Sequence, residues 1–143
     1  MNIQAQFGGD EERVARRLIE QAGTILKGLR GDMPESFAAV LFAGATPEDL
    51  VRYEPRELAE LAESAWLFLH ERKLGVPKIR FDSRSGPIGA ESIKSVAIIE
   101  ILNTDMPFLL DSVMGELTNQ GLDVRLMLHP IFTVEREDRK SVV

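Results

Sequence analysis

Apolar residues recur every three or four positions through the first half of the chain, which is the spacing of amphipathic helices. The first such pattern consists of Val14, Leu18, Ile25 and Leu29, with charged residues between them. We predict a helix from about Asp10 to Leu29. Acidic side chains favour the start of a helix and basic ones its end. Three acids stand at the predicted start, and Lys27, Arg30 and Gly31 stand at the predicted end.

Three further helices are predicted in the same half. The apolar segment PESFAAVLFAGA, residues 34–45, predicts a buried helix that packs on the first one. Thr46, followed by proline and two acids, predicts the start of a short helix over 47–53. From Arg56 to Lys73, leucine and alanine recur at helical spacing, and Gly75 ends the pattern. The first half is therefore predicted to be a helical array.

The pattern changes to an alternation of polar and apolar residues after Gly75. Lys78, Arg80 and Asp82 alternate with Ile79 and Phe81. This alternation predicts a half-buried strand with one face in water. A second, more apolar strand is predicted over 96–102, and the Ser-, Gly- and Pro-rich residues 83–92 between the two strands predict an exposed loop.

The last part of the chain is predicted to form a strand, a crossover helix and a strand. Helical spacing runs from Pro107 to Gly121, and residues 122–135 resemble a strand. A crossover in one sheet is right-handed and leaves its helix on one face. The other face stays exposed unless helices, another chain or missing sequence cover it. We therefore predict an α+β protein with a helical array over 1–75 and a small sheet unit over 76–143, and expect a fragment or an obligate oligomer.

Composition narrows the classes of function. The chain has 143 residues, 44% of them hydrophobic and 28% charged, as in ordinary soluble domains. It contains no cysteine, which excludes disulfides, thiol nucleophiles and cysteine-ligated metals. The net charge of -6 disfavours nucleic acid as a partner. No apolar run has the roughly 18 residues of a membrane span. We expect a cytoplasmic protein that binds neither nucleic acid nor membrane.

Few residues offer catalytic chemistry. His70 has no second histidine four positions away and is predicted to lie at the edge of the core, and His129 is predicted as a core or edge residue. Asp105 and Asp111 flank a helix start, where capping by Thr104 or Asp105 is favoured over acid–base catalysis. The glycines form no phosphate-binding loop. We predict no catalytic residue and no metal site.

One segment resembles a known module. The stretch SVAIIEILNTDMPFLLDSVMGELTNQG, from Ser95 to Gly121, resembles the ACT module, a βαββαβ ferredoxin-like fold that binds a small amino acid at a strand-to-helix turn in many metabolic enzymes. More narrowly, NTDMPFLLDSV, LAESAWLFL and PKIRFD are similar to the amino-terminal region of the large bacterial NAD-specific glutamate dehydrogenases. The similarity runs from about Pro34 to about Glu137. It implies that residues 76–143 are a truncated, partial ferredoxin-like (ACT-like) unit.

The resemblance also implies a function. The parent enzyme of such a segment oxidises L-glutamate to 2-oxoglutarate and ammonia with NAD, in domains far downstream. The segment itself serves regulation or assembly and holds no cofactor. The implied partners are the downstream domains of the same polypeptide, further copies in a homo-oligomer, and an amino-acid effector. The effector site implied by the ACT turn consists of Asn103, Asp105, Met106, Pro107 and Phe108. Amino-acid-binding ACT turns carry a glycine after the proline, where this chain has Phe108, and burial of Phe108 in a domain interface is the alternative.

Two other functions stay open. The chain could be a free-standing amino-acid sensor, an oligomer in which Asp105 and the backbone after it bind a ligand between two copies. It could also be a small enzyme that uses Asp105 and Asp111 for acid–base chemistry. Ligand binding accompanied by dimerisation would favour the sensor, and absence of binding would favour a docking segment.

Overall fold

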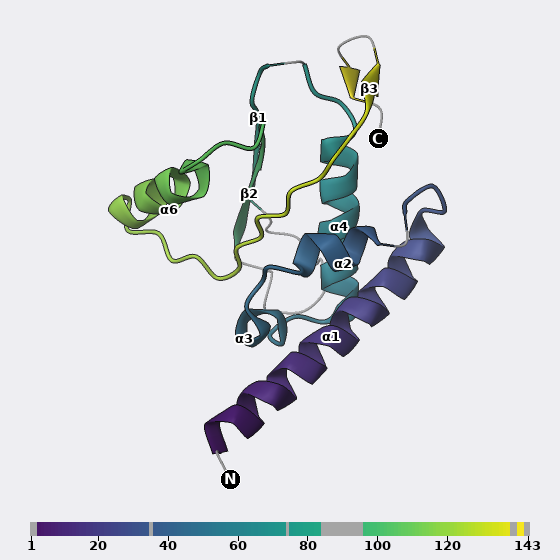
Figure 1. The fold of residues 1–143 in the computed structure, drawn as a ribbon, viewed down its shortest axis with the longest axis vertical. Coiled ribbons are helices and arrows are strands. Elements are labelled where there is room, and N and C mark those ends of the chain that lie inside the picture. Colours follow the sequence, from purple (N-terminus) through teal and green to yellow (C-terminus); the bar gives the residue numbers. More distant parts are fainter. Residues whose placement is uncertain (1–2, 35, 74, 84–95, 138–139, 142–143) are drawn as a thin grey trace.

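The computed structural model describes residues 3–34, 36–73, 75–83, 96–137 and 140–141, with helices in the first half and small antiparallel sheets in the second (Figure 1). The helical half comprises α1 (Ile3–Leu29), α2 (Phe37–Phe42), α3 (Pro47–Leu50) and α4 (Pro55–Leu69). The second half comprises β1 (Lys78–Ser83), β2 (Ala97–Leu102), α6 (Leu109–Asn119), β3 (Arg136–Glu137) and β4 (Lys140–Ser141). Helical and sheet parts are thus segregated along the chain, which confirms the α+β class.

The hydrophobic core lies in the helical array. Every buried residue in the described part of the chain falls between Ala15 and Leu69. Ala22 on α1 and Ala62 on α4 are fully buried, and α1 packs against α4. Small side chains let the two helices approach closely. The predicted apolar stripe of α1 is therefore partly wrong, because Val14 and Leu29 are exposed while alanines and Leu26 face the core.

Two helix boundaries differ from the predictions. Helix α1 begins at Ile3 instead of Asp10, and Asp10 pairs with Arg13 within the helix instead of marking its start. Helix α4 ends at Leu69 instead of Lys73. The Lys78 ammonium donates a hydrogen bond to the Phe68 carbonyl oxygen at 2.7 Å. In a continued helix this carbonyl would accept from the backbone four residues later, so the lysine contact stabilises the earlier end.

Strands β1 and β2 form an antiparallel ladder whose two faces differ sharply. Ile79 opposes Ile101 and Phe81 opposes Ile99 in the ladder, and these apolar pairs share one face because side chains alternate along a strand. The opposite face carries the pair Arg80–Glu100, and this face packs on α4. The prediction of a half-buried strand with a wet polar face is wrong here. Ile79 and Phe81 are 67% and 65% exposed, whereas the charged side faces the helix. The loop predicted over 83–92 lies, beyond Ser83, outside the described residues.

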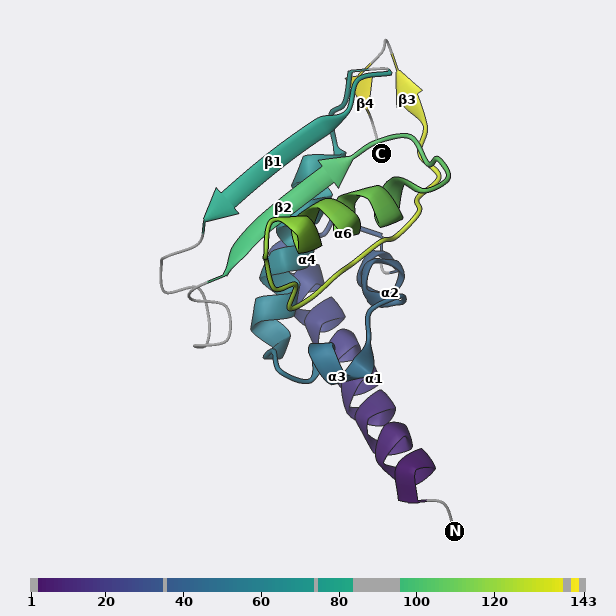
Figure 2. The ribbon, with the colours of Figure 1, turned by 90° about the vertical axis from the view of Figure 1, so that its left-hand side faces the viewer.

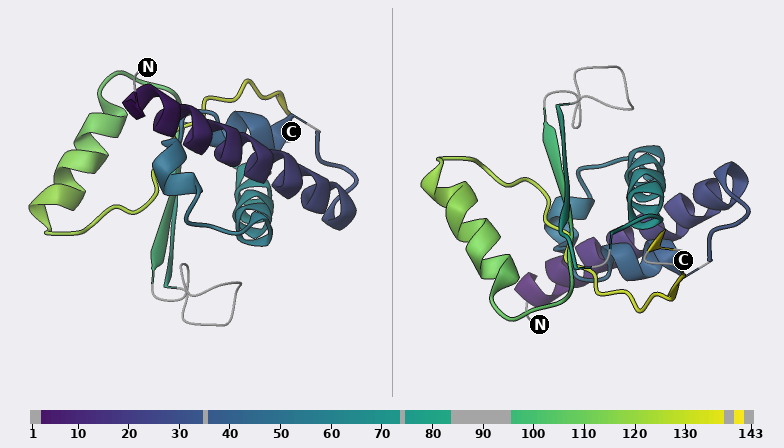
Figure 3. Two further views of the ribbon diagram at one scale, coloured as in Figure 1. Left: turned by 90° about the horizontal axis from the view of Figure 1, so that it is seen from below. Right: turned by 90° about the horizontal axis from the view of Figure 1, so that it is seen from above.

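Helices α4 and α6 lie on opposite sides of this hairpin (Figure 3). Figure 2 shows α6 in front of β2, with the chain after α6 running past both towards β3. The strand predicted over 122–135 does not form. Apart from a bond from Leu122 to Leu117, no backbone hydrogen bond joins residues 122–135 to the described part of the chain. The segment is held instead by side chains, among them Leu126, Leu128 and Phe132, which pack on the core.

Candidate functional site

The turn between β2 and α6 contains the predicted effector residues. Asn103 is half-buried, and Asp105, Met106, Pro107 and Phe108 are exposed. The sequence thus brings these five residues together at one edge of the sheet unit. Arg72, which follows α4, anchors the start of the turn: its Nη2 donates to the Asn103 Oδ1 at 3.3 Å and to the Thr104 Oγ1 at 3.2 Å.

Phe108 adopts a backbone conformation that favours glycine. Its φ of 64° and ψ of 2° lie in the left-handed region, and it is the one non-glycine residue with positive φ among the described residues. A non-glycine residue there costs on the order of 1–3 kcal/mol. The resemblance to ACT turns implies a glycine at this position, and the backbone here takes a conformation that favours glycine although the residue is Phe108. Phe108 is 78% exposed, so the described residues do not bury it.

Helix α6 begins without a side-chain cap. Phe108 stands at its N-cap position, and its side chain makes no capping hydrogen bond to the first N–H groups of the helix. The prediction that Thr104 or Asp105 caps this helix is therefore wrong. The Thr104 hydroxyl faces Arg72 instead. Asp105 and Asp111 have no hydrogen-bond or ion-pair partner within the described ranges, so no neighbouring donor or cation orients either carboxylate there.

Neither histidine forms a hydrogen bond or ring contact with the residues of the turn in the described part of the chain. His70 packs edge-on against Trp66, with ring centroids 5.2 Å apart, at the edge of the core as predicted. Its Nδ1 is buried without a hydrogen-bond partner among the described residues. His129 is exposed on the unpaired segment after α6. Across the described ranges, no three His, Asp or Glu residues gather as metal ligands would.

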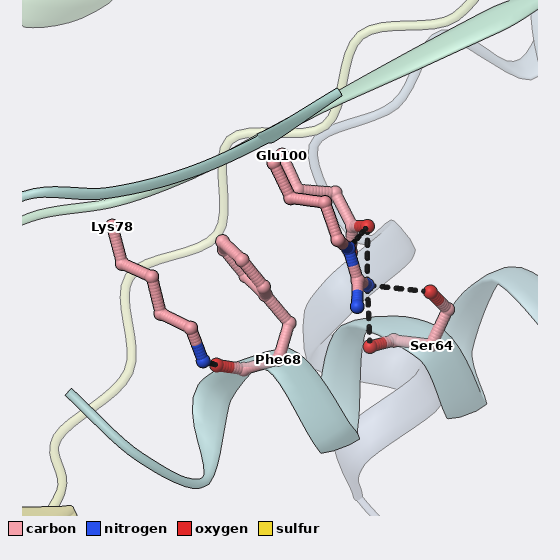
Figure 4. A network of polar contacts seen from close by, with 5 residues as sticks. Ser64, Phe68, Lys78 and Glu100 are labelled. Carbon is pink, nitrogen blue, oxygen red and sulfur yellow. Dashed lines mark hydrogen bonds and ion pairs between the residues drawn. The ribbon is translucent and has the colours of Figure 1, made fainter. Parts of the chain in front are cut away.

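Polar contacts attach the hairpin to α4 (Figure 4). Arg80 forms an ion pair with Glu100 across the ladder at 2.5 Å and donates to the Ser64 Oγ of α4 at 2.8 Å. The Lys78 ammonium donates to two carbonyl oxygens at the end of α4, those of Phe68 and Glu71. Both cations also lie over the Phe68 ring, at 4.5 Å and 4.8 Å from its centroid. Our sequence analysis missed this interface, although the alternation of basic residues in β1 was its signal.

A large apolar groove lies beside β2, between the helical array, α6 and the segment after α6. Its volume is about 850 Å³. The groove is lined by β2, by apolar residues of α6, by the segment 122–132 and by residues of the helical array. No residue of α6 is buried. The exposed apolar face of the hairpin, defined by Ile79, Phe81, Ile99 and Ile101, is therefore left without close packing by the described residues.

The described residues do not fit NAD. A dinucleotide site needs a glycine-rich turn between a strand and a helix, where the backbone approaches the pyrophosphate. The turn between β2 and α6 contains no glycine from Asn103 to Phe108. None of the described helices combines the length and apolarity needed to cross a membrane.

Comparisons with known proteins place these features in a family. Residues 37–143, well over half of the chain, match the family model described as "Glutamate dehydrogenase, ACT1 domain". The chain is also 30% identical over 105 residues to the NAD-specific glutamate dehydrogenase of Halomonas elongata. This match covers 73% of the chain but 6% of that relative's length. No solved structure matches the chain significantly.

Proposed function

Because the chain belongs to the glutamate dehydrogenase ACT1 domain family, we propose that it is the amino-terminal regulatory and assembly segment of a large NAD-dependent glutamate dehydrogenase. The parent enzyme converts L-glutamate, NAD⁺ and water to 2-oxoglutarate, ammonium, NADH and a proton. Catalysis and NAD binding belong to other domains of that polypeptide. The named relative, a NAD-specific glutamate dehydrogenase of which this region is 6%, supports this division of labour.

The apolar groove is the observation that carries the proposal. Contiguous apolar surfaces of this kind on a protein mark interfaces, because leaving them in water is unfavourable. Here the exposed hairpin face and α6 both contribute apolar side chains to the groove. The occupant we propose is a downstream domain of the same polypeptide, in an enzyme that is a homo-oligomer. Docking there couples the sheet unit to the rest of the enzyme.

The turn after β2 is the proposed effector site of the same segment. We assign amino-acid binding to Asn103, Asp105, Met106, Pro107 and Phe108. The exposure of residues 105–108, the left-handed backbone at Phe108 and the lack of a side-chain cap from Phe108 at the start of α6 support this assignment. An effector that binds two arrangements of the turn with different affinity shifts their populations, and through them the parent enzyme.

The docking proposal is tested in the parent polypeptide by Ile99→Asp, which places a charge in the groove. The expected result is loss of the native oligomer in sedimentation, or at least a roughly tenfold lower kcat/KM for glutamate, because burying an unpaired carboxylate is costly. Val14→Asp is the matched control, since Val14 is an equally exposed apolar residue on α1, away from the groove. An Ile99→Asp enzyme that matches the wild type in assembly and rate would refute docking.

The 143-residue chain alone provides a second test. Incubated with L-glutamate and NAD, it is expected to form no NADH, as followed by absorbance. Turnover by the purified chain would show that the division between this segment and the catalytic domains is wrong.

A further inference from the structure

Arg72 forms no ion pair with a carboxylate of the described residues. Its partners are three neutral acceptors: the Val76 carbonyl oxygen at 3.0 Å from Nε, and the Asn103 and Thr104 side-chain oxygens near Nη2. The ion pairs among the described residues involve other arginines, and none involves Arg72. An arginine that is held in place without a carboxylate is suited to bind an anion, because its planar fork matches a carboxylate with two parallel hydrogen bonds.

The position of Arg72 places this charge at the proposed effector turn. The Asn103 Oδ1 accepts from Arg72 and, at 2.9 Å, from the Thr104 backbone N–H. The guanidinium is thereby fixed at the first two residues of a turn whose remaining residues are exposed. A guanidinium can bind a carboxylate through two parallel charge-assisted hydrogen bonds, whereas the Asn103 and Thr104 side chains each offer a neutral oxygen. A carboxylate that reaches the turn therefore competes with the two neutral side-chain acceptors.

We propose that Arg72 recognises the carboxylate of an amino-acid ligand at the turn Asn103–Phe108, exchanging its contacts with Asn103 and Thr104 for the ligand. This inference rests on the proposed effector role of the turn. It adds a residue from outside the strand–turn–helix segment, supplied by the stretch that follows α4. Because Arg72 lies three residues after the end of α4, the exchange alters a contact between the sheet unit and the end of the helical array. His70 lies two residues before Arg72 in the sequence, and its ring contacts Trp66. Trp66 is therefore near the site of this exchange along the chain.

The experiment uses the 143-residue chain and titrates it by calorimetry with each of the common L-amino acids and with their amides, which lack the carboxylate. We expect at least one acid to bind saturably and its amide to bind about tenfold more weakly or worse. Arg72→Gln should lower the affinity for that amino acid by at least about tenfold. Arg72→Lys should restore part of this affinity. Lys73→Gln, which removes the neighbouring exposed cation, should leave the affinity unchanged.

Asn103→Asp keeps the test decisive if Arg72→Gln disturbs folding. It introduces a carboxylate that pairs with Arg72 inside the protein and so competes with the ligand. We expect about tenfold weaker binding of the acid in a chain at least as stable as the wild type. Circular dichroism and Trp66 fluorescence report the fold of each variant.

The outcomes separate this inference from the docking function. If no acid binds, or if binding is insensitive to Arg72→Gln in a folded chain and to Asn103→Asp, the role of Arg72 is refuted. Binding that depends on the turn but not on Arg72 would keep the effector site and remove this residue from it. Failure of the docking function would be detected in a separate experiment, in which the Ile99→Asp parent enzyme matches the wild type in assembly and rate.

Discussion

The helical array buries Glu57 completely, and no other charged residue is buried among the described residues. Its Oε1 accepts a hydrogen bond from the Glu54 backbone N–H at 2.9 Å, and the Glu54 side chain in turn accepts from the backbone of Glu57. Together with Pro55 in the first turn, this capping box fixes the start of α4. One buried carboxylate thus anchors the helix to which the hairpin attaches.

Replacing Glu57 by alanine should lower the free energy of unfolding by about 1–2 kcal/mol, because a helix N-terminal donor loses its partner at a buried site. Glu57→Gln keeps an acceptor oxygen and should cost less. Urea unfolding followed by the fluorescence of Trp66, the chain's single tryptophan, measures the loss. Glu63→Ala on the same helix is the control and should change stability by less than about 0.5 kcal/mol. Equal losses at both positions would contradict the role of the cap.

Tyr53 gives the array a dependence on alkaline pH. Burial raises the pKa of Tyr53 above its ordinary value of 10.0, and the nearby Asp49 carboxylate adds to the rise. The folded state therefore holds the phenol proton more tightly than the unfolded state does. This contribution to stability is fully present below pH 10 and is lost as the pH rises through the folded pKa.

We expect the unfolding free energy of the wild type to fall from about pH 10 upward more steeply than that of Tyr53→Phe. Since Tyr53 is the only tyrosine, absorbance at the phenolate band follows its titration directly. Urea unfolding at several pH values on both sides of 10 gives the slopes. Parallel slopes for the two proteins would show that the phenol proton is not linked to folding.

At the scale of elements, the contacts that attach the hairpin to α4 are mainly polar, with Leu102 as a partly buried apolar contribution to the core. The Arg80–Glu100 pair and its bond to Ser64 form one contact, and the Lys78 ammonium on the last carbonyls of α4 forms the other. Such contacts are partly exposed and individually weak. The hairpin is therefore expected to detach from the array at a lower free energy than the array unfolds.

Arg80→Ala should lower the free energy of opening of β1 and β2 by about 1 kcal/mol, which speeds their amide exchange roughly fivefold. The amides of α1 and α4 should keep their exchange rates. Hydrogen exchange followed by mass spectrometry resolves these segments. Arg56→Ala, which removes an exposed ion pair on α4 itself, is the control. Exchange that rises equally in helices and strands would mean that the hairpin and array open together.

Local patterns predicted most elements but not how they meet. The alternation of residues 78–82 and the apolar run 96–102 predicted both strands, and Gly75 and Gly121 take the positive φ expected after helices. The prediction of which hairpin face packs on the helices was wrong. Periodicity shows that the two faces of a strand differ, but it does not show which face contacts α4. The role of Arg72 was missed for the same reason. Its partners Asn103 and Thr104 are some thirty residues away in sequence, and local spacing carries no signal for them.

For the molecule as a whole, burial is distributed unevenly between its halves. Among the described residues, the buried ones lie before His70, and the sheet unit contributes only partly buried apolar residues to the core, among them Leu102 and Phe132. Phe132 stacks on Phe37 with ring centroids 5.2 Å apart, and Phe37 meets Trp66 edge-on. The helical array can therefore stabilise itself, whereas the sheet unit depends on the array and on what fills the groove.

This asymmetry predicts different fates for the two proposed units, residues 1–75 and 76–143. The first should fold alone with cooperative thermal unfolding, at a lower temperature than the whole chain because the contacts of Leu102 and Phe132 are lost. The second should show no cooperative transition, since its described residues bury no side chain fully. Circular dichroism on both fragments checks this. If 76–143 unfolds cooperatively as a monomer, its apolar faces must already be covered within that unit, and a partner in the groove is no longer required.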